Sequence, residues 1–204
     1  MSQSLDRQRL LLTGCTHAVA LTSVAWLMLK VVQSDLGPDP IKTLLLTTGE
    51  WGLWCLIASL MVTPLRSSSG AYQLAVTRRP LGLWAFAFFS LHVLIFLQGY
   101  VVWSQSLLIE ELVERPYITV GFLAWLLLLP LAITSTLKWR RRLGRRWKSL
   151  HTLVYPAAIF ACLHILWQIR SDWFLASFYS VVCGLLLGSR LFLYLRRRAN
   201  RVAE

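Results

Sequence analysis

The feature that most constrains this 204-residue chain is the recurrence of apolar runs about 20 residues long. A run of that length is what a helix needs to cross the hydrocarbon core of a bilayer. Charged residues make up only 15% of the chain, against about 25% in a typical soluble domain, and they gather between the apolar runs. The sequence therefore predicts an all-α integral membrane protein with no large soluble domain.

Breaks that contain proline separate the apolar runs. They include GPDP at 37–40, TPLR at 63–66, RRP at 78–80 and RPY at 115–117. Proline does not continue a helix, but it is tolerated in the first helical turn. No internal repeat is apparent. We expect a single domain over 1–204, a bundle of six transmembrane helices at about 10–32, 44–64, 81–103, 117–137, 150–169 and 173–195.

The basic residues predict the orientation of these spans. Sixteen of the 21 lysines and arginines lie in the N-terminus, the 65–80 and 138–149 connections and the C-terminal tail, seven of them in 138–149. The positive-inside rule then places both termini in the cytoplasm. Charge that follows span ends indicates orientation and contact with anionic lipid, not nucleic acid. A docking face for an acidic cytosolic electron donor is the alternative role of 138–149.

Four histidines lie inside predicted spans, and two of them share one depth. His92 lies 12 residues past Pro80 and His164 lies 14 residues past Leu150, so both rings are expected about 18–21 Å from the inner ends of their helices. A lone histidine there often bonds a neighbouring hydroxyl or carbonyl. Two imidazoles at equal depth can instead supply both axial nitrogens of one haem iron, which suits electron transfer because no coordination position stays open.

His151 precedes His164 by 13 residues, or about 20 Å of helix, which is enough for a second haem near the inner leaflet. An ideal helix would not point both rings the same way. Pro156 lies between them; it either kinks the helix and re-phases its two ends, or is simply tolerated there. By the same spacing the partner of His151 falls at Arg78, which does not ligate iron.

His17 is the remaining histidine in the inner half of the predicted bundle. We treat it as the candidate fourth ligand; the alternative is a hydrogen bond to Thr13 or Thr22. A zinc or copper site would need further ligands at the depth of His92, and no acidic residue is available there. The cysteines lie inside apolar segments without metal-type spacing and are expected to be packing residues: Cys15, Cys55, Cys162 and Cys183.

Several short motifs resemble one known family when they are taken together. They follow the same order over nearly the whole chain: GPDPIK (37–42), TGEWGLW (48–54), TPLR (63–66), TRRPLGLWAFAFFSLH (77–92), RPYITVG (115–121), TSTLKWRRRLGRRWKSLHTLVY (134–155) and CLHILW (162–167). The set is similar to the MsrQ family of haem-containing membrane subunits, within the ferric-reductase and NADPH-oxidase transmembrane group.

The resemblance implies one or two b-type haems in the bacterial inner membrane, with FMN also associated with the family, although no FMN motif is apparent. His92, His151 and His164 match the family's haem-binding positions, and Arg78 stands where the wider group has its fourth histidine. No catalytic residue is implied here, because methionine sulfoxide reduction is expected in a periplasmic molybdopterin partner, MsrP. The implied electron source is the quinone pool or a cytosolic flavin reductase.

The absence of nucleotide-binding motifs agrees with a role as an electron carrier. The chain has no GxGxxG, no P-loop and no room for a flavin or nicotinamide domain, so its electrons must come from a partner or a membrane carrier. The acidic connections at 35–39 and 110–114 are predicted to meet the periplasmic partner. The alternative is a small transporter or assembly scaffold without haem. That role predicts intramembrane carboxylates or broken helices in repeated halves; neither is evident, since Glu50 is expected near the outer end of its span.

Overall fold

The computed structural model describes residues 2–168 and 173–202, and all regular structure in these ranges is helical. Shorter elements connect the long helices. The long helices are α1 (Ser2–Val32), α2 (Pro40–Ser69), α3 (Arg78–Phe96), α5 (Pro116–Ile133), α8 (Val154–Gln168) and α9 (Trp173–Val202); the shorter elements are η1 (Tyr72–Val76), the π-helical turn η2 (Leu97–Val101), α4 (Gln105–Glu114), α6 (Leu137–Leu143), α7 (Arg145–Leu150) and the 3₁₀ turn η3 (His151–Leu153).

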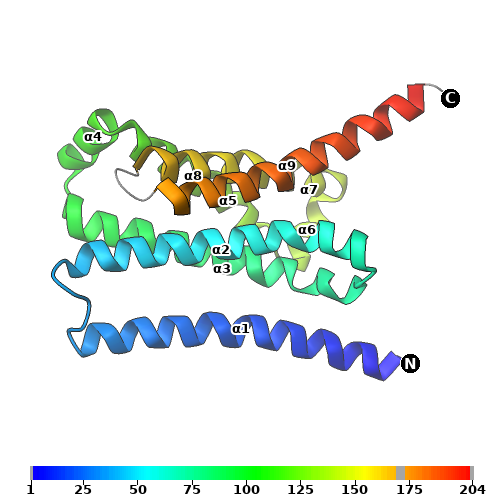
Figure 1. Ribbon diagram of the computed structural model, residues 1–204, viewed down its shortest axis with the longest axis horizontal. Helices are drawn as coiled ribbons and strands as arrows, with labels where there is room; N and C mark the ends of the chain where they lie inside the picture. The colour runs from blue at the N-terminus through cyan, green and yellow to red at the C-terminus, as the bar shows by residue number, and fades with distance from the viewer. Residues whose placement is uncertain (1, 169–172, 203–204) are drawn as a thin grey trace.

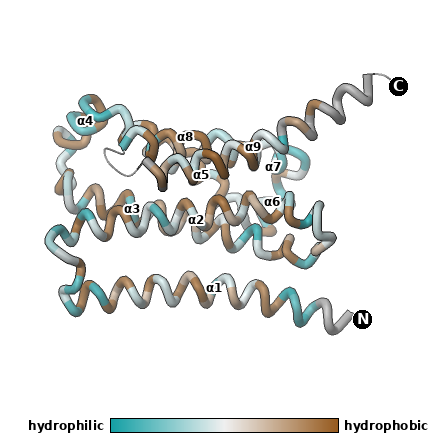
Figure 2. The backbone as a smooth tube through the Cα atoms, viewed as in Figure 1, coloured by the Kyte–Doolittle hydropathy of each residue, from teal (hydrophilic) through white to brown (hydrophobic). Residues whose placement is uncertain are grey.

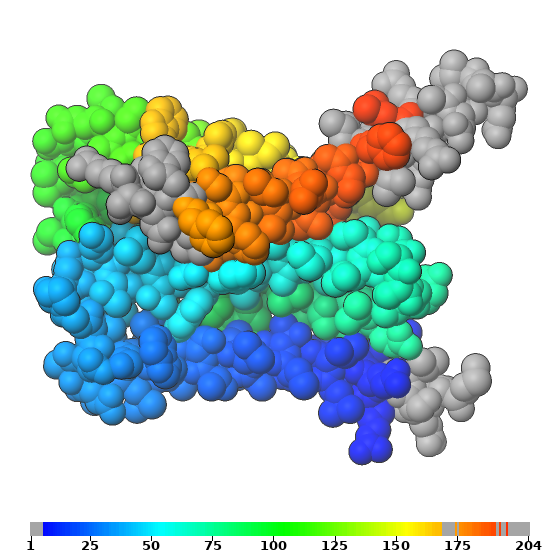
Figure 3. All heavy atoms as spheres, viewed as in Figure 1, coloured from blue at the N-terminus to red at the C-terminus, as the bar shows by residue number. Residues whose placement is uncertain are grey.

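The long helices form three layers: α1, then α2 with α3, then α5 with α8 and α9 (Figure 1). Helix α1 lies along one side of the molecule (Figure 3) and packs on α3 and η1. The start of α1, the end of α9 and helices α6 and α7 lie at one end of the bundle, and α4 lies at the opposite end (Figure 1). The basic 138–149 segment therefore shares an end with both termini.

Among the described residues, five helical segments are long and apolar enough to cross a membrane. They coincide with the first five predicted spans, and hydrophobic residues follow the long helices while polar ones collect at the ends (Figure 2). Many large apolar side chains point outward, as expected where hydrocarbon surrounds a helix. The chain is a multi-pass membrane protein. The predicted span 173–195 falls on α9, so a sixth crossing stays a prediction; residues 169–172, including Arg170 and Asp172, lie outside the described residues.

The prediction that TPLR closes the second span is wrong. Helix α2 continues through Pro64 to Ser69 and is capped by Gly70, whose φ of 66° is in the left-handed region. Proline lacks an amide hydrogen, so the carbonyl of Leu60 loses its partner within the helix. The guanidinium of Arg190 in α9 donates to that carbonyl instead. A side chain from another helix thus satisfies the backbone group that the proline leaves free.

Two other predicted spans are interrupted near one end. The third turns into the π-helical η2 after Phe96, and the chain then reverses through Val102 and Trp103, both with positive φ. The fifth begins as α7, passes through η3 and becomes α8 at Val154. Pro156 lies in the first turn of α8, where a missing amide breaks no helical hydrogen bond. The irregularity before His164 is therefore the 3₁₀ turn at His151, and Pro156 itself is tolerated.

Small side chains let α8 pack closely against α5 and α9. Ala157 and Ala158 have no exposed surface and Ala161 almost none, which lets the backbone of α8 approach α5 and α9 closely. Cys162 is buried in the same cluster, together with Cys183 of α9. The packing role predicted for the cysteines is confirmed for these two; Cys55 is half-buried and Cys15 is exposed.

Candidate functional site

Two histidines from different helices face each other inside the bundle. The ring centroids of His92 in α3 and His164 in α8 are 6.2 Å apart, and the ring planes are perpendicular, at 90°. Both rings line a cavity of about 650 Å³ that α2 and α5 complete. The structure therefore brings together the two residues that the sequence placed at equal depth.

A backbone carbonyl holds each of these rings by its Nδ1 atom. His92 Nδ1 lies 2.8 Å from the carbonyl oxygen of Leu45, and His164 Nδ1 lies 2.7 Å from that of Tyr117. A carbonyl only accepts hydrogen bonds, so Nδ1 is the protonated nitrogen in both neutral rings. Nε2 then keeps its lone pair, and this arrangement is typical of metal-binding histidines.

A glycine lies under each ring, one helical turn after the residue whose carbonyl accepts. A Cβ atom at Gly49 would lie 2.9 Å from His92 Nδ1, and one at Gly121 would lie 2.6 Å from His164 Nδ1. Both distances are too short for carbon against a ring nitrogen. The rings reach the carbonyls because both positions lack a side chain.

We call each set of carbonyl residue, glycine and histidine a cradle: Leu45, Gly49 and His92 form the first, and Tyr117, Gly121 and His164 the second. The two cradles use the same spacing. In each, the glycine follows the carbonyl residue by four positions and the histidine follows the glycine by 43, so all three positions of the second cradle are offset by 72 residues from the first. The pairs α2–α3 and α5–α8 are thus two equivalent walls of one site. The prediction of no internal repeat is wrong at this level, because the repeat resides in three spaced positions and not in a run of similar sequence.

The ring separation fits one metal ion between the two histidines. Two metal–imidazole bonds of about 2 Å each, plus two ring radii, span roughly 6 Å, which agrees with the 6.2 Å observed. No group of three or more histidine, cysteine or acidic side chains that could hold a metal occurs in the described part of the chain. A pair of nitrogens without other protein ligands suits an iron whose remaining four positions belong to a porphyrin.

The rest of the cavity is apolar inside and charged at a few places. Phe89, Phe122 and Trp125 contribute aromatic walls, and Lys42 and Arg115 contribute positive charge. Arg115 also lies 3.0 Å from Glu111 of α4. These two cations are candidates to pair with the carboxylates of a porphyrin.

One carboxyl group also lines the cavity. Glu50 accepts a hydrogen bond of 2.8 Å from the hydroxyl of Tyr179, a residue of α9 that is only 1% exposed. Glu50 lies in the first half of α2 and lines the same cavity as His92 and His164. An ionisable residue at this place is available to act electrostatically on any group bound between the two rings.

His151 lies in a different setting, at the start of η3. Its ring stacks on Trp147, with centroids 3.9 Å apart, and its Nε2 atom is 3.1 Å from the hydroxyl oxygen of Thr134. That hydroxyl donates its own hydrogen to the carbonyl of Pro130, at 2.6 Å, so toward His151 it accepts. Nε2 of His151 is therefore protonated. Arg78 is close enough to act on His151 electrostatically.

His17 is partnered by a tryptophan. The indole Nε1 of Trp84 donates to His17 Nδ1 at 3.0 Å, and an indole nitrogen is a donor only. The hydroxyl partners considered at Thr13 and Thr22 are not the ones formed. Among the described residues, no contact is recorded between His17 and His151, whereas His92 and His164 are brought together.

Sequence reasoning missed the residues that support the histidines. Gly49, Gly121, Thr134 and Trp147 are such residues. The equal separation of each glycine from its histidine was visible in the sequence and is the signal that could have identified the cradles. The contacts of Thr134 and Trp147 depend on the turn between α5 and α8 and leave no such spacing.

Comparisons with known proteins agree with this arrangement. Residues 48–162 match the family model described as "Ferric reductase like transmembrane component". Proteins named "Protein-methionine-sulfoxide reductase heme-binding subunit MsrQ" are similar over most of their length: those of Xanthomonas euvesicatoria and Xanthomonas campestris are 44% and 45% identical, each over 89% of this chain and 86% of the relative. The chain belongs to the MsrQ family. The member from Xanthomonas oryzae is 42% identical over 91% of this chain and 88% of its own. No solved structure matches the chain.

The region that matches the family model covers most of the two cradles, but not all of their residues. It begins at Thr48, next to Gly49, and ends at Cys162, two residues before His164. It therefore contains both glycines, His92 and the whole His151 setting. The match therefore includes much of the cavity lining but leaves out Leu45, His164 and Tyr179, which complete the cavity.

Proposed function

We propose that this chain is a b-type-haem electron-transfer subunit of the bacterial inner membrane, with both termini in the cytoplasm and one transmembrane domain over 1–204. The observation that carries the proposal is the His92–His164 pair, with rings 6.2 Å apart and both Nε2 lone pairs free. The printed names of the relatives describe haem-binding subunits, which supports haem as the group between these rings.

Different residues of the chain would bind the haem iron, orient its ligands and pair with its carboxylates. His92 and His164 would hold the haem iron, and the carbonyls of Leu45 and Tyr117 fix which nitrogen each ring presents. Iron held by two imidazoles passes single electrons and leaves no position for a substrate to bind. Phe89, Phe122 and Trp125 would pack against the haem, and Lys42 and Arg115 would supply positive charge for its carboxylates.

The reaction served by these electrons is expected in another protein. Reduction of methionine sulfoxide to methionine consumes two electrons and two protons and releases water, and we assign it to the periplasmic molybdopterin subunit MsrP. The relatives' names place them in a methionine sulfoxide reductase system. Electrons come from the quinone pool or a cytosolic flavin reductase, since the chain carries no nucleotide-binding motif of its own. The outcome is repair of oxidised periplasmic proteins.

The inner histidine is proposed to bind a second haem. His151 matches a haem-binding position by resemblance, and Arg78 lies near it in place of a fourth histidine. His17 is occupied by Trp84, so it serves as the second ligand only if it exchanges that partner. The FMN that the resemblance implies also stays a prediction.

Reconstitution in liposomes tests this function. The purified chain is incorporated with MsrP outside, a water-soluble methionine sulfoxide peptide outside, and a reduced quinol analogue in the membrane or a flavin reductase with its nicotinamide inside. Methionine should form with the wild-type chain and fall to background with His92→Ala or His164→Ala. The Cys15→Ala variant, altered at an exposed position outside the cavity, should support the wild-type rate. A colourless wild-type protein from a haem-replete host, or equal rates for all variants, contradicts the proposal.

A further inference from the structure

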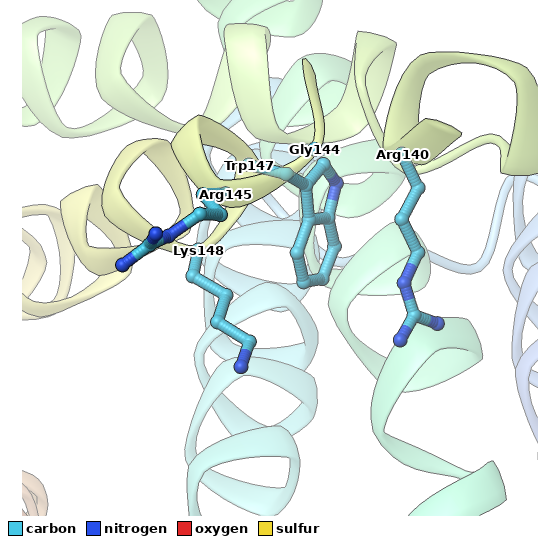
Figure 4. A pocket seen from close by; sticks show the side chains of 5 residues that line it. All are labelled: Arg140, Gly144, Arg145, Trp147 and Lys148. Carbon is cyan, nitrogen blue, oxygen red and sulfur yellow. The ribbon is translucent and has the colours of Figure 1, made fainter. Parts of the chain in front are cut away.

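A basic cleft lies at the end of the bundle that holds both termini. It has a volume of about 470 Å³ and is lined by Arg140, Gly144, Arg145, Trp147 and Lys148. Figure 4 shows the side chains of Arg140 and Lys148 extending on either side of the Trp147 ring, in the same general direction. The cleft is separate from the cavity that contains His92 and His164.

The turn between α6 and α7 shapes this cleft. Gly144 joins the two short helices with φ 51° and ψ −121°, a combination that side-chain-bearing residues rarely adopt. The chain reverses there, so Arg140 approaches from α6 while Trp147 and Lys148 approach from α7. The conformation of this turn places Arg140, Arg145 and Lys148 along the same cleft as Trp147.

The positive charge of this cleft has no counter-charge from its own part of the chain. The sequence contains no Asp or Glu between Arg115 and Asp172. The ion pairs recorded among the described residues involve Arg9, Lys30 and Arg115, none of which is near 138–149 in sequence. Like charges held together favour an added anion, and arginine and lysine around one space suit the oxygens of phosphate.

One wall of the cleft contacts His151. The indole of Trp147 stacks on the His151 ring at 3.9 Å and an angle of 29°, and the guanidinium of Arg140 lies 5.3 Å from the same indole. The indole Nε1 is fixed by a 3.0 Å hydrogen bond to the carbonyl of Thr134, whose hydroxyl holds His151. A change at Arg140 therefore has one side chain between it and His151.

We propose that this cleft binds a phosphate group, carried by an anionic phospholipid headgroup or by a soluble phosphate, and that Trp147 transmits its presence to His151. The exposed Leu137 at the start of α6 is available to contact an acyl chain beside the headgroup, and basic side chains at a membrane surface attract anionic lipid. The binding of phosphate does not depend on the proposed function. Only an effect of that binding on a haem held by His151 rests on the proposed function.

The binding test uses the full-length, haem-loaded chain and a charge-matched control. Wild type, the Arg140→Gln/Lys148→Gln double variant and the Arg141→Gln/Arg142→Gln double variant are placed in phosphatidylcholine nanodiscs. One set contains added phosphatidylglycerol, whose retention is counted by native mass spectrometry; the other receives inorganic phosphate, whose binding is measured by calorimetry. Both double variants lose the same charge from the same segment, but only the first alters the cleft.

We expect the cleft variant to bind the probe about tenfold more weakly or worse, since hydrogen bonds to charged groups are lost, while the control stays within about twofold of wild type because its side chains lie outside the cleft. Retention of phosphatidylglycerol identifies a lipid source and binding of inorganic phosphate a soluble one; either supports the site. Equal weakening in both variants shows diffuse attraction by the basic segment and overturns the proposal, as does no binding by wild type.

The transmission of phosphate binding through Trp147 is measured on the His151 ring. The chain has four histidines, so histidine-selective carbon labelling gives few NMR signals. They are recorded in the dithionite-reduced protein under carbon monoxide, which makes a five-coordinate ferrous haem low-spin and diamagnetic. The signal that disappears in His151→Gln belongs to His151. Addition of whichever probe binds should shift this signal in the wild-type protein and leave it unshifted in the Arg140→Gln/Lys148→Gln variant. Binding without a shift at His151 rejects the transmission step. Failure of haem binding would appear separately, as a missing Soret band.

Discussion

The two ends of the bundle hold histidine in opposite tautomers. At His92 and His164 a carbonyl accepts from Nδ1, which leaves the Nε2 lone pair free. At His151 a hydroxyl whose hydrogen is already given to Pro130 accepts from Nε2, which leaves the lone pair on Nδ1. The partner atom thus decides which nitrogen of each ring is a ligand. His92 and His164, which we call the outer pair, therefore offer their Nε2 lone pairs to the cavity, whereas His151 must exchange Thr134 before its Nε2 can bind a metal.

The sharpest test of this difference compares His164→Ala with His151→Ala. Removing His164 takes away one of two facing ligands, so we expect the low-spin haem signal of the cavity to disappear. Removing His151 should lower the total haem content and leave that signal intact, because it lies at the other end of the bundle. Haem per polypeptide and the reduced-minus-oxidised spectrum check both. Loss of the outer signal in His151→Ala would show that the two ends are not independent.

The glycine cradles give the next largest effect. Gly121→Ala places a carbon 2.6 Å from His164 Nδ1, and Gly49→Ala places one 2.9 Å from His92 Nδ1. Overpacking of this kind costs about 1–3 kcal/mol, so haem should bind about 5- to 160-fold more weakly, and more so for Gly121→Ala. Competition for haem with apomyoglobin measures the change.

The matched control for the cradles is Gly184→Ala. This helical glycine of α9 has no atom within 4 Å of its ideal Cβ position, and alanine is the better helix former. Its haem affinity should equal that of wild type. Equal losses at all three positions would show that the cradles have no special role.

Substitution of Glu50, the carboxyl residue in the cavity of His92 and His164, is expected to shift the midpoint potential of the haem bound there. Glu50→Gln removes a negative charge that favours ferric over ferrous iron, so the midpoint potential of the outer haem should rise by about 60 mV, which corresponds to a tenfold change in a one-electron equilibrium. Spectroelectrochemical titration measures it. Tyr179→Phe keeps the carboxyl and is the control for loss of the hydrogen bond. An unchanged potential in Glu50→Gln would contradict an electrostatic role for this carboxyl group.

The smallest expected effect concerns the cations of the outer cavity. Lys42→Gln and Arg115→Gln should each speed haem loss about two- to fivefold, the range expected for an exposed ion pair worth up to about 1 kcal/mol, and the difference should shrink at high salt. Stopped-flow transfer of haem to apomyoglobin gives the rates. Lys30→Gln removes an equal charge from a lysine that pairs with Asp35 and does not line the cavity, so it should have no effect.

The spans and the outer pair were predictable because both depend on depth along a helix. Apolar length located five spans, and distance from each span end placed His92 opposite His164. Pro64 was misread because a single sequence does not show that Arg190, 126 residues later, caps the carbonyl it leaves free. The setting of His151 was not predictable for a similar reason: its protonation depends on Thr134 and Pro130, which approach it only after α5 has packed on α8.

The central claim is that His92 and His164 hold one haem iron between perpendicular rings. The angle between axial imidazole planes sets the splitting of the iron orbitals that hold the unpaired electron, so low-temperature EPR of the ferric protein reads it directly. The 90° interplanar angle predicts a single, strongly anisotropic low-field signal that vanishes in both His92→Ala and His164→Ala. A rhombic three-line signal of parallel planes, a high-spin signal, or a signal that survives either substitution would contradict the account.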